Sequence, residues 1–119
     1  MRGRIILTIV YDFQNEAEEH ALLTQFSNLG TLELKTDPLP YPKIENSRII
    51  DFYFALNEAF GYSAAVAVMT TSIAAEWTIL NAETPNETEY IYNRSAGNTV
   101  AHEVYQFIRW AHIQPQYFE

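Results

Sequence analysis

The sequence contains no cysteine among its 119 residues. Disulfide bonds, thiolate nucleophiles and every cysteine-based metal site are therefore excluded. A chain without disulfides suits a reducing compartment, so we expect a cytoplasmic protein.

Long apolar runs are missing as well. No stretch approaches the roughly 20 apolar residues that span a bilayer. The apolar run Ile5–Val10 is also shorter than the core of a signal peptide, which is roughly 7–15 residues long. We therefore expect no membrane partner.

Glycine and histidine form no motif for catalysis or cofactor binding. The four glycines are isolated from one another, so they make no phosphate-binding loop. The three histidines, His20, His102 and His112, lack the i, i+4 spacing of a helical zinc site. We expect no metal, no cofactor and no enzymatic activity. The alternative is a small enzyme or ligand-binding domain that uses Asp12, at the end of a predicted strand.

Basic residues are scarce. Seven Lys and Arg stand against fifteen Asp and Glu, which gives a formal net charge of −8. Such a surface repels nucleic acid and anionic lipid, and it attracts basic proteins. We therefore expect a basic protein partner and no nucleic-acid partner.

Apolar and aromatic residues are plentiful. Hydrophobic residues make up 48% of the chain, and seven Phe, eight Tyr and two Trp supply large side chains for a core. The length fits one globular domain over residues 1–119.

The first third of the chain predicts a strand, a helix and a second strand. Ile5–Tyr11 is short and β-branched, which is typical of a central strand buried on both faces. A capping Asn and an apolar stripe predict a helix over 15–29, and alternation predicts a strand over 31–36. A right-handed crossover would make the two strands parallel neighbours. The proline-rich segment 37–42 is either a stiff connector or a recognition loop.

The remaining elements are less uniform in their patterns. Residues 47–61 keep a 3–4 spacing that predicts a helix, although Ile50, Phe52, Phe54 and Leu56 also alternate as in a strand. Residues 62–72 alternate and predict a strand, with a helix as the alternative because of their alanines. Residues 76–80 and 88–92 predict a hairpin around the turn 84–86. A last helix begins at Asn98 or Thr99 and ends near Pro115.

These elements predict a single α+β domain. The expected order is β-α-β-α-β-β-β-α, with a mixed or mostly antiparallel sheet of about five strands and with three helices.

Acidic side chains lie beside tyrosines in the predicted hairpin, and a second acidic group opens the first predicted helix. Tyrosine supplies rigid contact area, and carboxylates attract a cationic partner. The first candidate surface comprises Glu83, Glu87, Glu89, Tyr90 and Tyr92. The second comprises Glu16, Glu18 and Glu19. The alternatives are an ordinary polar hairpin and ordinary compensation of a helix dipole.

The layout resembles the immunity proteins of bacterial toxin systems, including contact-dependent growth inhibition. The resemblance rests on the Ile5–Tyr11 strand, the helix from Glu16 to Leu29, the hairpin from Trp77 to Tyr92 with its acidic edge, and the acidity of a cysteine-free chain. It implies stoichiometric neutralisation of a basic toxin, such as a nuclease domain. Alternatives are a phage-type inhibitor of a host nucleic-acid-binding complex, the Asp12 enzyme, and a structural homo-oligomer.

Overall fold

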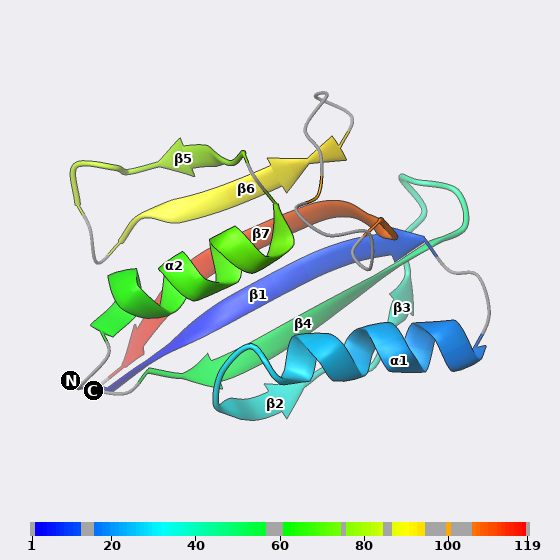
Figure 1. The fold of residues 1–119 in the computed structure, drawn as a ribbon, viewed down its shortest axis with the longest axis horizontal. Coiled ribbons are helices and arrows are strands. Elements are labelled where there is room, and N and C mark those ends of the chain that lie inside the picture. The colour runs from blue at the N-terminus through cyan, green and yellow to red at the C-terminus, as the bar shows by residue number, and fades with distance from the viewer. Residues whose placement is uncertain are drawn as a thin grey trace.

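In the computed structural model of the chain, residues 2–12, 16–56, 61–74, 76–84, 87–94, 100 and 106–118 are described. Within these ranges two helices lie against one sheet of seven strands (Figure 1). The helices are α1 (Glu16–Ser27) and α2 (Gly61–Ile73). The strands are β1 (Arg2–Asp12), β2 (Leu32–Lys35), β3 (Leu39–Pro40), β4 (Ser47–Ala55), β5 (Thr78–Leu80), β6 (Glu89–Asn93) and β7 (Ile108–Phe118).

The sheet is antiparallel at every strand pair among these residues. Its order is β2-β4-β1-β7-β6-β5, and β3 pairs with β4 beside β2. The central position predicted for the first strand is confirmed, because β1 lies between β4 and β7. The two ends of the chain lie together at one end of the sheet (Figure 1).

One face of the sheet carries the core, and both helices cover that face (Figure 1). Leu7 lies between Phe52 on β4 and Ile113 on β7, and all three side chains are buried. Cross-strand partners share a face, so these rows pack together beneath the helices. The helices contribute Leu22, Leu23 and Phe26 from α1, and Tyr62, Val66, Met69 and Ile73 from α2.

On the opposite face Val10 is buried, but Ile6 and Thr8 are only half-buried. Thr8 donates a hydrogen bond of 2.5 Å to Asp51 there. Tyr53, Trp110 and His112 are partly exposed on the same face. The expectation that the first strand is buried on both faces is therefore wrong, because helices cover one face alone among the described elements.

The first two predicted strands are not neighbours. β2 and β1 do run in the same direction, since each is antiparallel to β4. However, β4 lies between them, so the predicted crossover pair is wrong. β4 lies next to β1 in place of β2, because β4 pairs with β1 along nearly its whole length. The pairing runs from Arg4 opposite Ala55 to Asp12 opposite Ser47.

The helix predicted over 47–61 is wrong. Residues 47–55 form β4, in which Ile50, Phe52 and Phe54 are buried in alternation. β-Branched and aromatic side chains fit the pleated surface, and this preference outweighs the helical spacing. Gly61, which was expected to end that helix, instead begins α2.

The strand predicted over 62–72 is also wrong. Its buried residues, Tyr62, Val66, Met69 and Ile73, follow the spacing of one helix face. Alanine favours a helix, and Val68, which the strand pattern would bury, is 47% exposed. The alternative of a helix over this segment is therefore confirmed.

The last predicted helix is wrong where the structure describes it. Residues 108–118 form β7, while 95–99 and 101–105 lie outside the described part of the chain. Pro115, expected to stop a helix, lies within β7 opposite Ile5. The pairing of β6 with β7 reaches no further than Ile113, so Pro115 has only β1 beside it. A proline is tolerated at such a one-sided position because it has no N–H to donate.

The α+β class and the mostly antiparallel sheet are confirmed, but the number and order of the elements are corrected. In the described part of the chain, seven strands and two helices replace the expected five and three, and the order is β-α-β-β-β-α-β-β-β. The helix over 15–29, the strand over 31–36 and the hairpin of 76–80 with 88–92 are confirmed as α1, β2 and β5–β6. Of the expected turn 84–86, only Thr84 is described.

Neither helix in the described parts of the chain is both long enough and apolar enough to cross a membrane.

Two tyrosines of the core, Tyr11 and Tyr62, have raised pKa values. Tyr11 is fully buried and donates a hydrogen bond of 2.7 Å to Glu19, and Tyr62 is 3% exposed. Burial raises the pKa of Tyr11, and the hydrogen bond to Glu19 raises it further. Burial likewise raises the pKa of Tyr62, with smaller contributions from Tyr90, Tyr117 and Glu89.

We predict that the free energy of unfolding falls as the pH rises above about 10. Tyrosines in the unfolded chain ionise near the ordinary pKa of 10.0, whereas the fold keeps Tyr11 and Tyr62 protonated to higher pH. The unfolded state therefore binds fewer protons in this range and becomes more favoured. Urea unfolding, followed by circular dichroism at about pH 8, 10 and 11, measures the change.

The variant Tyr62→Phe is the control, because it removes one of these ionising groups. It loses about 1 kcal/mol near pH 8 through its missing hydrogen bond, and its stability then declines less steeply above pH 10. An equally steep decline in the variant and the parent would contradict the assignment.

Candidate binding surface

Four arginines of this protein, Arg4, Arg48, Arg94 and Arg109, form ion pairs with carboxylates of the same chain. Arg48 lies 3.1 Å from Glu19, and Arg4 lies 3.9 Å from Glu33. Arg94 and Arg109 both approach the carboxylate of Asp12. Four of the seven basic residues therefore form ion pairs within the chain.

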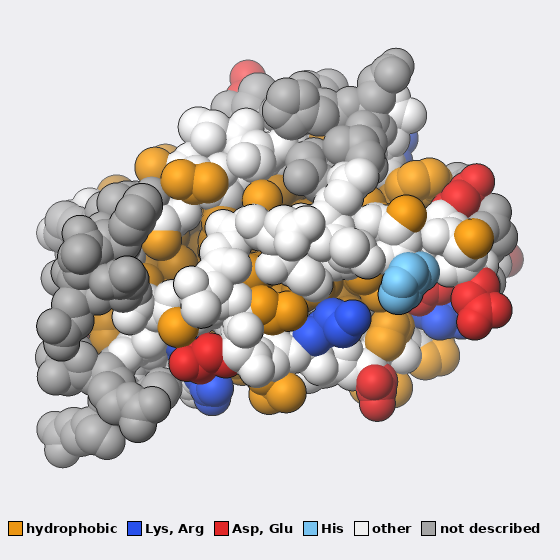
Figure 2. Space-filling view, turned by 60° about the horizontal axis from the view of Figure 1, so that its bottom comes forward, with side chains coloured by type: hydrophobic (Ala, Val, Ile, Leu, Met, Phe, Trp, Pro, Cys, Tyr) orange, Lys and Arg blue, Asp and Glu red, His pale blue; other side chains and the backbone are white. Residues whose placement is uncertain are grey.

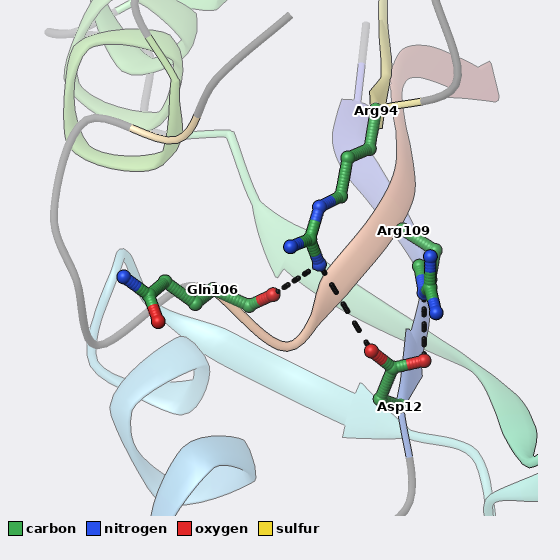
Figure 3. Close-up of polar contacts among 4 residues, drawn as sticks. All are labelled: Asp12, Arg94, Gln106 and Arg109. Atoms are coloured by element: carbon green, nitrogen blue, oxygen red, sulfur yellow. Dashed lines mark hydrogen bonds and ion pairs between the residues drawn. The ribbon is translucent and has the colours of Figure 1, made fainter. Parts of the chain in front are cut away.

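Asp12 lies between Arg109 of β7 and Arg94, which directly follows β6 (Figure 3). Arg109 Nε donates to Asp12 Oδ1 at 2.7 Å, and Arg94 Nη1 lies 3.9 Å from Oδ2. Arg94 also donates to the carbonyl oxygen of Gln106 at 2.8 Å. A β-bulge creates this geometry: Val10 faces Trp110 while Tyr11 faces Ile108, so Arg109 is the additional residue between them.

Among the described residues, the hollow beside Asp12 is too small to hold a substrate. This hollow is lined by Glu18, Glu19, Leu22 and Phe107, and it leaves no volume for a water molecule. Ligand pockets usually measure about 300–1,000 Å³. Asp12 therefore joins the ends of β1, β6 and β7.

The acidic group on α1 does not act as one surface. Glu19 is 9% exposed, because it accepts hydrogen bonds from Tyr11 at 2.7 Å and Arg48 at 3.1 Å. Glu16 and Glu18 are exposed in the first turn of the helix. On the side of the molecule where α1 lies, acidic side chains are interspersed with apolar and basic ones (Figure 2).

The hairpin of β5 and β6 is held in shape by its own turn. Asn81 adopts a left-handed conformation with φ of 57°. The amide of Thr84 donates to Asn81 at 3.0 Å, and the amide of Glu87 donates to Thr84 at 2.8 Å. The buried hydroxyl of Thr88 donates to the carbonyl oxygens of both Asn81 and Thr84, at 3.1 and 3.0 Å. Backbone that carries acidic side chains is thereby fixed.

Hydrogen bonds near both ends of α2 hold the β5–β6 hairpin against the helix. Near the start of the helix, the hydroxyl of Tyr62 donates to the carbonyl oxygen of Thr88 at 2.5 Å. Near its end, the Trp77 indole N–H lies 3.1 Å from the carbonyl oxygens of both Thr70 and Ala74. Trp77 also packs against Tyr92, with ring centroids 6.1 Å apart. The helix therefore positions both the acidic turn and the strand that precedes it.

The structure separates the five residues predicted for the hairpin surface into two groups. Glu83 and Glu87 are exposed on the turn. Glu89 is half-buried, with its carboxylate 2.7 Å from His112 Nε2, and Tyr90 is also half-buried. Tyr92 is fully buried in the core, so its ring supports the hairpin and is not available to a partner.

Two further residues belong to this surface. Glu76 is exposed just before β5. Tyr117, on the end of β7, is 37% exposed; burial raises its pKa, and the nearby charge of Glu87 raises it further. Glu76 was visible in the sequence as the first residue of the predicted strand 76–80. Tyr117 had no local signal, because the sheet pairing alone brings it near the hairpin.

A second hollow lies in the loop between β3 and β4. It measures about 300 Å³ and is lined mainly by apolar side chains of residues 40–48. The proline-rich segment forms one wall, and the amide of Tyr41 donates to the carbonyl oxygen of Ser47 at 2.9 Å. The segment connects β2 to β4 and includes β3, as expected of a stiff connector.

The described residues contain no group of three or more potential metal ligands. His20 is exposed on α1, His112 contacts Glu89, and His102 lies outside the described part.

We predict that Thr88→Val loosens the acidic turn without disturbing the sheet. The change keeps the shape of the side chain but removes the hydroxyl that bonds Asn81 and Thr84. We expect a loss of about 1–2 kcal/mol in stability, because carbonyl groups lose a buried partner. Amide hydrogen exchange of Thr84 and Glu87, measured by NMR, should accelerate.

Thr71→Val is the matched control. Thr71 is exposed on α2, where its hydroxyl donates to its own helix at 2.7 Å. This variant should leave exchange in the turn unchanged. Unchanged exchange in Thr88→Val as well would show that the hydroxyl does not fix the turn.

No protein-family model matches the chain, and comparisons with curated proteins and with solved structures find no match. The resemblance to immunity proteins therefore stays a prediction, and the chain is not assigned to a family.

Proposed function

We propose that this protein is an immunity protein: a stoichiometric inhibitor that binds a basic toxin domain of the nuclease class and neutralises it in the cytoplasm. The binding surface in this proposal is the β5–β6 hairpin, with Glu83 and Glu87 on its turn, Glu76 before it and Tyr117 beside it.

The observation that supports the proposal most is the division of charge. Arg4, Arg48, Arg94 and Arg109 each lie within 4.0 Å of a carboxylate of the same chain. The chain as a whole carries a net charge of −8, and Glu76, Glu83 and Glu87 are among its exposed acids. Such a field raises the rate at which a cationic protein is captured.

The rigidity of the hairpin also favours binding. Association is weakened when side chains and loops must first be ordered. Here the turn is fixed by Thr88, and the hairpin is fastened to α2 through Tyr62 and Trp77. The acidic side chains thus project from a backbone that is already in place.

The protein would inhibit the nuclease because its carboxylates take the place of the nucleic-acid phosphates in the partner's binding site. A nuclease binds phosphates with Lys and Arg, and carboxylates form short charge-assisted hydrogen bonds with the same groups. A hairpin that presents Glu83 and Glu87 would occupy the cationic site and exclude the nucleic acid.

Co-expression with a candidate toxic nuclease domain tests the function. We expect restored growth and a one-to-one complex on size-exclusion chromatography. Continued toxicity without a complex would refute the proposal.

We predict that Glu83→Lys with Glu87→Lys slows association with this nuclease by about tenfold or more at low salt, because electrostatic steering is reversed. Stopped-flow measurements at rising ionic strength should show the difference shrinking, since salt screens the charges.

The matched control is Asp37→Lys with Glu45→Lys, which changes the net charge equally at exposed positions near β3. It should slow association much less. Equal slowing by both double variants would show that the overall charge attracts the partner and that the hairpin has no special role.

A further inference from the structure

β5 is the outermost strand beyond β6 among the strands described, and its side chains are open to solvent. Ile79 is 52% exposed and Leu80 is 42% exposed. In the sheet, Ile79 pairs with Tyr90 and Leu80 pairs with Glu89. Successive side chains of a strand point to opposite faces, so β5 presents one apolar side chain on each face of the sheet.

The other edge of the sheet is protected in ways that β5 is not. Folded proteins commonly block an edge strand with lysine, other charges or proline. β2 carries Glu33 and Lys35, and β3 contains Pro40. β5 consists of Thr, Ile and Leu, with neither a charged residue nor a proline.

The charges around β5 are all of one sign. Glu76 precedes the strand and Glu83 follows it, and both are exposed. Around β2, by contrast, Glu33 and Lys35 are mixed, and Glu33 lies 3.9 Å from Arg4. An apolar strand between two carboxylates is suited to a partner segment that alternates apolar and cationic side chains.

We propose that a cationic strand of the partner adds to the outer edge of β5 and extends the sheet. This inference rests on the proposed function, because it describes how the same hairpin surface holds the basic partner. Main-chain hydrogen bonds to β5 would supply affinity, and contacts with Ile79 and Leu80 would set the register. Lys or Arg at the ends of the added strand would reach Glu76 and Glu83.

A second copy of this chain does not fit the same edge. Antiparallel pairing of two β5 strands centred on Ile79 would bring Glu76 of each copy close to Glu83 of the other. Like charges opposite one another destabilise strand pairing. Each copy also carries a net charge of −8, which opposes self-association.

The test uses a capped peptide of about eight residues that alternates lysine and valine, a length typical of strands. We expect its binding at low salt to slow amide hydrogen exchange in residues 78–80 but not in residues 32–35 of β2. A version of the peptide that is N-methylated at every second residue keeps its charge but loses N–H donors along one edge. It should bind at least about tenfold more weakly, a difference of 1.4 kcal/mol.

Ile79→Lys should also weaken the peptide by about tenfold or more, because a lysine blocks the edge and repels the cationic strand. Leu34→Lys on β2 adds the same charge at an equally exposed leucine, 52% exposed, and should have a much smaller effect.

Binding of the peptide without protection of β5, or equal binding of the N-methylated peptide, would overturn strand addition. These outcomes would not contradict the proposed function, which the co-expression experiment tests separately. Absence of peptide binding, or a dimer of this chain in sedimentation that Ile79→Lys abolishes, would also overturn the inference.

Discussion

The antiparallel pairing of β1 with β4 and β7 is the constraint on which the rest of the structure depends. β1 pairs with both neighbours along almost its whole length. Its register decides which side chains face the helices: Leu7 and Ile9 point into the core, and Thr8 points away. A slip of one residue would exchange the two faces. The bulge opposite Val10 and Tyr11 also depends on this pairing, and it brings Arg109 to Asp12.

One consistent pattern is enough to predict α1 and β1. The last predicted helix fails although no second pattern competes with it, because residues 108–118 pair with β1 as β7. Two other predictions fail where two patterns compete. α1 and β1 have unambiguous signals, and both are found. In 47–61 and 62–72 apolar residues satisfy helical and alternating spacing at once, and the outcome depends on which strand β1 accepts as a neighbour. At the candidate surface, Glu83 and Glu87 are exposed on the turn, but burial of Tyr92 follows from packing that no local pattern reveals.

Charge has two separate uses in this molecule. Buried or half-buried acids join elements: Glu19 connects α1 to β1 and β4, and Asp12 connects the strand ends. Glu83 and Glu87, the described acids of the hairpin turn, are exposed to solvent, and the β5–β6 hairpin lies at the edge of the sheet farther from α1 (Figure 1). A count of charges cannot separate these uses, because both kinds are Asp and Glu with similar neighbours in the sequence.

The closing of the sheet by the first and last strands sets the order of events during synthesis. Arg2 pairs with Phe118, and the other residue pairs of β1 and β7 are likewise far apart in the sequence. β1 can pair with β4 early, but its second neighbour is absent until β7 has left the ribosome. Contacts of such long range slow folding. The edge of β1 that faces β7 therefore has no neighbour until β7 has been made.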